Sequence, residues 1–72
     1  MYKILLVEDI DLIRKDIAEM IDWGSYGYIL TGEARNGEQG LELYQKNPAD
    51  IIITDIRMPV MDGLKMIQEI LS

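Results

Sequence analysis

Three short hydrophobic runs divide the chain, and each has the length of a β-strand. They cover residues 2–7, 28–34 and 51–54. Residues 4–7 and 51–53 are uninterrupted aliphatic runs, which is typical of parallel strands covered on both faces. The middle run is interrupted by three small or polar residues, Thr31, Gly32 and Glu33. We therefore expect that strand to be a half-exposed edge strand.

Apolar residues recur at helical spacing between the first two strands. A helix is expected from Leu12 to Asp22, with Asp11 as its N-cap. Its apolar positions are Ile13, Ile17, Met20 and Ile21. Glycines between Trp23 and Gly27 then end the helix and turn the chain, and Trp23 is expected to anchor this loop.

A second helix is expected to begin at Asn36-Gly37. Gln39 lies three residues after Asn36, which is close to a capping box, and Asn47-Pro48 ends the helix. Leu41 and Tyr44 should face the interior.

A third helix should start at Asp62-Gly63, where Asp62 can act as a cap. Its apolar stripe is predicted to contain Leu64, Ile67, Ile70 and Leu71. The nearby methionines are expected to be packing residues, because thioethers prefer soft metals and no cysteine accompanies them. They are Met58, Met61 and Met66.

This alternation of strands and helices predicts an α/β fold with a parallel sheet. If the first strand lies between the other two, the order is 2-1-3, the first half of a flavodoxin-like sheet. The third strand would then be patterned as an interior strand but would have one open edge. Such an edge is an association site.

Composition narrows the possible partners and location. The 72 residues fit at most one domain, and 13 acidic against 7 basic residues give a net charge of −6. This charge disfavours direct contact with nucleic acid or an anionic membrane and favours divalent cations. No cysteine, signal peptide or membrane span is found in the sequence, so a cytoplasmic location is expected.

Carboxylates follow the first and third strands at the edge of the sheet where open α/β folds place their ligand sites. Glu8 and Asp9 end the first strand and Asp55 ends the third, so the three should converge. Converging carboxylates repel unless a pKa rises or a cation binds, and an incomplete set of oxygen ligands suits Mg²⁺. Asp55 is therefore a candidate phosphoryl acceptor or metal ligand. Taken alone, Asp9 would be read as a loop acid or a helix cap, and Glu8 as a solvated charge.

The same residues resemble the receiver domain of two-component response regulators. The resemblance is carried by Glu8 and Asp9 after the first strand, Asp55 after the third, Pro59 in the next loop, and Met61-Asp62-Gly63 before the third helix. It implies a phosphoryl-accepting module of signal transduction, which is not an enzyme.

The resemblance also implies a role for each residue of the site. Asp55 would accept a phosphoryl group from a histidine kinase. Glu8, Asp9 and Asp55 would hold Mg²⁺, together with the backbone carbonyl of Arg57. Glutamate at position 8 departs from the commoner aspartate, and because it is longer we expect it to act through a water molecule.

A finer resemblance concerns the output of the parent protein. The segments 21–23, 32–34 and 36–37, with Gly27, are similar to receivers fused to AraC-type helix-turn-helix domains. Transcriptional control would then belong to an output domain outside these residues, which are not expected to contact DNA.

Receivers carry two further βα units, with a Ser or Thr and a Lys that hold the phosphoryl oxygens, and none can be assigned here. Lys46 and Lys65 fall in helices and are the wrong lysines by position. Residues 1–72 are therefore expected to be the amino-terminal part of a receiver. Such a part could act instead as an association module that dimerises through its open third strand and is not phosphorylated. A Mg²⁺-dependent phosphohydrolase is disfavoured, because no second acid follows Asp55 closely.

Overall fold

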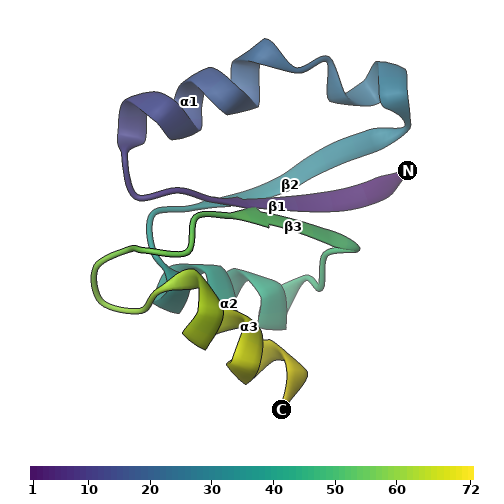
Figure 1. Cartoon of the computed structure of the whole chain (residues 1–72). Helices are drawn as coiled ribbons and strands as arrows, with labels where there is room; N and C mark the ends of the chain where they lie inside the picture. The colour runs from purple at the N-terminus through teal and green to yellow at the C-terminus, as the bar shows by residue number, and fades with distance from the viewer.

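The computed structural model describes all 72 residues. Its parallel sheet contains β1 (Tyr2–Val7), β2 (Tyr28–Ala34) and β3 (Ile51–Thr54), in the order β2-β1-β3. Both the predicted α/β class and the 2-1-3 order are confirmed. The helices are α1 (Asp11–Met20), α2 (Gly37–Lys46) and α3 (Gly63–Leu71), with a short 3-10 helix, η1 (Trp23–Tyr26). Figure 1 shows α1 on one face of the sheet and the pair α2 and α3 on the other.

Two of the three expected helix caps are confirmed. The Asn36 side chain accepts a hydrogen bond from the Gln39 amide, and the Asp62 side chain accepts one from the Lys65 amide, each at 2.8 Å. The Gln39 side chain in turn accepts from the Arg35 amide at 2.8 Å, one residue before the position of an ideal capping box.

The predicted cap at Asp11 is wrong. Helix α1 begins at Asp11 itself, after Ile10, and no side chain caps it. Asp11 instead pairs with Arg14 at 2.7 Å, one turn further along the helix. The helix also ends at Met20, before the expected Asp22. The predicted loop anchor is confirmed, because the Trp23 indole donates to the Ala18 carbonyl at 3.0 Å.

The core lies between β1 and the layer formed by α2 and α3. Its buried centre consists of Leu5, Val7, Ala34 and Met66. Met66 fits there because α2 has Gly40 at the facing position, where a Cβ would lie 2.6 Å from the Met66 sulfur. Leu41, Tyr44, Met58 and Met61 pack around this centre, as predicted.

The predicted apolar stripe of α3 is only half right. Ile67 and Ile70 pack against the core, whereas Leu64 and Leu71 are exposed. The helix is rotated so that Met66 and Gly63 face inward, because the absence of a side chain at Gly40 leaves space for Met66.

The α1 face of the sheet is less completely covered. Ile4 and Leu6 are buried there, but Ile13 and Met20 of α1 remain exposed and α1 contains no buried residue. None of the helices is long and apolar enough to cross a membrane.

Candidate functional site

The register of the sheet brings the three predicted acids together. Val7 lies opposite Thr54, so the next residues, Glu8 and Asp55, leave neighbouring strands side by side. The carboxylate oxygens of Glu8, Asp9 and Asp55 lie within 4.8 Å of one another. The backbone supports this placement, because the Asp55 amide donates to the Val7 carbonyl at 3.3 Å.

Glu8 is the innermost acid of the cluster. Only 7% of its surface is exposed, and its carboxylate accepts a hydrogen bond from the Ile10 amide at 3.2 Å. Burial is the largest influence on its pKa and raises it above the usual value, and the carboxyl groups of Asp9 and Asp55 raise it further. The Ile10 amide opposes this shift but does not cancel it.

The other two acids are increasingly open to solvent. Asp9 is half-buried and Asp55 is exposed. Asp55 therefore combines access for an incoming group with contact to a partly desolvated acid cluster. This combination suits a carboxylate that is to react with a group brought by another molecule.

The loop from Asp55 to α3 is fixed by backbone contacts. The Gly63 amide donates to the Ile56 carbonyl and the Gly37 amide to the Met61 carbonyl, each at 2.7 Å. A side chain at Gly63 would overlap the Asp55 carbonyl, so only glycine allows α3 to begin this close to the acid.

A tight turn lies at the tip of the same loop. The Met61 amide donates to the Pro59 carbonyl at 2.8 Å, which makes Val60 the centre of a three-residue γ-turn. Val60 has a φ of 70°, a conformation that a β-branched residue rarely adopts. This strained turn was not predicted, although the sequence shows a Pro-Val pair in the loop.

Arg57 lies on the exposed part of this loop. Its carbonyl accepts no hydrogen bond from the protein and so is free for an external ligand. Its inclusion in the metal site stays a prediction.

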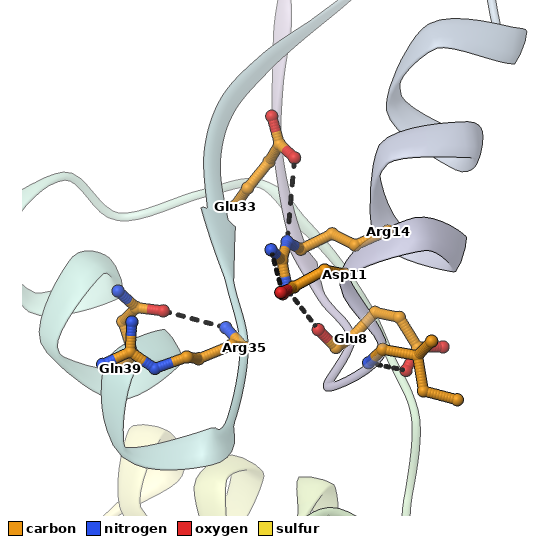
Figure 2. Close-up of polar contacts among 7 residues, drawn as sticks. Glu8, Asp11, Arg14, Glu33, Arg35 and Gln39 are labelled. Atoms are coloured by element: carbon orange, nitrogen blue, oxygen red, sulfur yellow. Dashed lines mark hydrogen bonds and ion pairs between the residues drawn. The ribbon is translucent and has the colours of Figure 1, made fainter.

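Arg14 lies beside the acid cluster, although it was not among the predicted site residues. Figure 2 shows its guanidinium between Glu8, Asp11 and Glu33, at the junction of β1, α1 and β2. The sequence indicated only its pairing with Asp11, because side chains three residues apart are neighbours on a helix.

Comparison with known proteins identifies the family. A sequence model described as "Response regulator receiver domain" matches residues 4–72. The chain belongs to the response regulator receiver family. Receiver domains are signalling modules of two-component systems that accept phosphoryl groups and bind Mg²⁺ at an acidic site, and this chain has an acidic cluster formed by Glu8, Asp9 and Asp55.

Individual receivers resemble the chain over nearly its whole length. An uncharacterized transcriptional regulatory protein, YesN of Bacillus subtilis, is 43% identical over 70 residues, which are 97% of this chain and 19% of YesN. The receiver domain of AraT, a response regulator from Geobacillus stearothermophilus, superposes with a TM-score of 0.89 at 37% identity. That match covers 94% of this chain and 53% of the solved chain.

A third relative is a solved two-component transcriptional regulator, AraC, from Clostridium phytofermentans. It has a TM-score of 0.88 and 31% identity, over 99% of this chain and 57% of the solved chain. The chain thus spans slightly more than half the length of these two solved chains, and about a fifth of YesN.

Proposed function

We propose that Asp55 accepts a phosphoryl group from a histidine kinase. The observation that carries this proposal is the convergence of Asp55 with Glu8 and Asp9 at the carboxyl ends of β1 and β3. An Asp55 carboxylate oxygen would attack phosphorus as the bond from phosphorus to the donor nitrogen breaks. The product is an acyl phosphate, and the donor histidine keeps the electron pair of the broken bond.

The cluster also fits a divalent cation. Two carboxylates at about 4 Å repel by about 4 kcal/mol at an effective dielectric constant near 20, so three of them favour either proton uptake or a cation. All the available donors are oxygens, which is the ligand set that Mg²⁺ prefers. When bound, Mg²⁺ would offset the negative charge that gathers on the transferring group.

We assign the protein ligands of Mg²⁺ to Asp9, Asp55 and the Arg57 carbonyl, with Glu8 acting through water. The deeper position of Glu8 and its hydrogen bond from the Ile10 amide support an indirect role. Asp9 and Asp55 are more accessible and can bind the ion directly.

The proposed setting is a longer regulator. Residues 1–72 would form the amino-terminal part of its receiver, and the other βα units would supply the groups that hold the phosphoryl oxygens. The regulator is proposed to control transcription through a separate output domain of the AraC type. Its proposed location is the cytoplasm. The similarity to YesN and to the regulator from Clostridium phytofermentans, both described as transcriptional regulators, supports this setting.

Substitution of the acceptor tests the proposal. Phosphorylated histidine kinase should transfer an acid-labile phosphoryl group to the parent protein, and Asp55→Asn should abolish the transfer. The control is Asp50→Asn, which changes an acid at the opposite end of β3 and should leave the transfer intact. Transfer that survives Asp55→Asn would show that the acceptor lies elsewhere.

A second candidate function is self-association of the 72-residue chain. Strand β3 pairs only with β1, and Ile51 and Ile53 are 39% and 37% exposed beside its open edge. A second copy could pair along this edge and cover both side chains. Sedimentation should then show a dimer that is the same with and without Mg²⁺ and a small phosphodonor. A well-folded monomer would exclude this function.

A further inference from the structure

Arg14 connects three elements at the rim of the acid cluster. Its Nη1 donates to the Glu8 carbonyl at 2.8 Å, at the end of β1. Its Nη2 donates to the Asp11 carboxylate at 2.7 Å, and its Nε lies 3.9 Å from the Glu33 carboxylate on β2. The Arg14 side chain is only 18% exposed, whereas the side chains of Asp11 and Glu33 are 83% and 44% exposed. The hydrogen bond to the Glu8 carbonyl is therefore the contact that is best shielded from water.

The contact with Glu8 fixes the peptide that joins two acids of the cluster. The Glu8 carbonyl and the Asp9 amide belong to the same planar peptide group. A hydrogen bond that fixes the carbonyl therefore also fixes the position of the Asp9 Cα. The Glu8 amide is held independently, because it donates to the Ala34 carbonyl at 2.9 Å. The backbone on both sides of Glu8 is therefore fixed.

Other cationic side chains do not have this role. The Lys46 and Lys65 side chains pair within their own helices, and Lys3 contacts Asn47. Arg14 is the only cationic side chain that hydrogen-bonds to the backbone of the cluster. A planar guanidinium can direct several N–H groups at once, which a single ammonium group cannot do in the same geometry.

We infer that Arg14 is a positioning residue that holds the Glu8–Asp9 peptide so that both acids face Asp55. This inference rests on the proposed function of the cluster as a Mg²⁺ site. Arg14 itself contacts neither the acceptor carboxylate nor a ligand. It acts through the backbone of the residues that do.

The direction of the change in Mg²⁺ affinity separates positioning from simple charge. If Arg14 acted only as a nearby positive charge, its removal would strengthen Mg²⁺ binding, because a repulsive cation would be lost. If it acts by positioning, its removal weakens binding. Residues that orient metal ligands typically change metal affinity by about 10-fold or more when they are removed.

The experiment compares the 72-residue protein with Arg14→Met, Arg14→Lys and Lys15→Met. Met keeps most of the apolar stem of Arg14, whereas Lys keeps its charge. Lys15 is an exposed neighbour on α1 that makes no hydrogen bond or ion pair through its side chain, so Lys15→Met is a control with the same change in net charge. Mg²⁺ is titrated while the NMR signals of the Glu8, Asp9 and Asp55 amides are followed.

We expect Arg14→Met to weaken Mg²⁺ binding by about 10-fold, and Arg14→Lys to recover part of that loss. Lys15→Met should bind as tightly as the wild-type protein or slightly more tightly. Equal or tighter binding by Arg14→Met would overturn the inference.

A second measurement does not depend on Mg²⁺. Hydrogen exchange of the Ile10 amide, which donates to the Glu8 carboxylate, should accelerate in Arg14→Met and stay unchanged in Lys15→Met. If the wild-type protein did not bind Mg²⁺, the proposed function would fail, and exchange at Ile10 would still decide whether Arg14 positions Glu8. If Arg14→Met did not fold, Arg14→Lys would be used for both measurements. It should then bind Mg²⁺ more weakly than the wild-type protein and show faster exchange at the Ile10 amide.

Discussion

Among the individual residues, Glu8 stands out as a buried acid with two further acids beside it. The Ile10 amide donates a hydrogen bond to its carboxylate, while burial, and after it the neighbouring acids, disfavour the ionised form. A carboxylate in this position lowers the stability of the metal-free protein once it is ionised, and a cation can reverse that effect. We propose that this destabilisation of the metal-free protein favours binding of Mg²⁺, because the bound cation would relieve it.

This arrangement predicts a specific dependence of stability on pH. The folded-state pKa of Glu8 lies above its usual value of 4.5, so the folded protein holds this proton more tightly than the unfolded chain. The resulting stabilisation is complete below the unfolded-state pKa and is lost as the pH rises through the folded-state pKa. Glu8→Gln, which stays neutral, should therefore raise the Tm of the metal-free protein at neutral pH and have much less effect in acid.

Thermal unfolding followed by circular dichroism, from acidic to neutral pH, measures this difference. The control is Glu19→Gln on α1, an exposed acid that makes no hydrogen bond or ion pair through its side chain. It should change the Tm little at any pH. A Glu8→Gln protein with an unchanged or lower Tm at neutral pH would contradict the assigned cause of the shift.

At the scale of elements, the loop between β3 and α3 carries the most constrained backbone near the site. The γ-turn at Val60 and the close start of α3 at Gly63 both shape the path of the chain after Asp55. Positive φ costs a residue with a side chain about 1–2 kcal/mol, whereas glycine adopts it freely. Val60 is 76% exposed, so little packing offsets this cost.

Val60→Gly is therefore expected to increase the free energy of unfolding, by up to about 1 kcal/mol after the greater freedom of glycine in the unfolded chain is subtracted. Chemical denaturation with urea measures the change. Arg57→Gly in the same loop is the matched control: Arg57 has no positive φ, so it should gain nothing and lose some stability. Equal losses in the two variants would show that the turn at Val60 is not strained.

The predictability of these elements follows the range of the interactions that form them. The caps at Asn36 and Asp62 could be read from the sequence because a cap contacts an amide only three residues away. Asp11 also precedes a helical pattern in the sequence and looked like a cap. Contacts with the Glu8 carbonyl and Glu33 hold Arg14 beside Asp11, however, so Asp11 pairs with Arg14 and does not cap the helix. That choice depends on β1 and β2 and is not visible in the helix itself.

The candidate site follows the same rule. Convergence of Glu8, Asp9 and Asp55 could be predicted because parallel strands bring their carboxyl ends to one edge of the sheet. Which face of α3 is buried could not, since Gly40 on α2 determines the position of Met66. Short-range signals and strand topology were sufficient to predict that the three acids converge. They were not sufficient to predict how the helices pack against each other.

At the scale of the whole molecule, the sheet is covered unevenly. Helices α2 and α3 cover one face, whereas α1 alone lies on the other (Figure 1). The register places Ile51 opposite Ile4 and Ile53 opposite Leu6, so these isoleucines extend the apolar α1 face toward the open edge of β3. An edge with exposed aliphatic side chains is prone to pair with another strand.

If the 72-residue chain self-associates through β3, as the second candidate function proposes, Ile53→Lys should reduce that association, because a charged side chain on an edge strand disfavours strand pairing. Sedimentation velocity over a range of protein concentrations measures the effect. Ile29→Lys changes an exposed isoleucine on β2, at the other edge of the sheet, and should leave association unchanged. Equal effects of the two substitutions would show that association does not use β3.

Chemical trapping identifies the acid that carries the phosphoryl group, which we propose to be Asp55. Borohydride reduces an aspartyl phosphate to homoserine, so the modified residue can be located by mass spectrometry after proteolysis of the phosphorylated parent protein. The proposed function predicts homoserine at position 55 and unmodified residues at positions 8 and 9. Modification at Glu8 or Asp9, or at an acid outside the cluster, would contradict it.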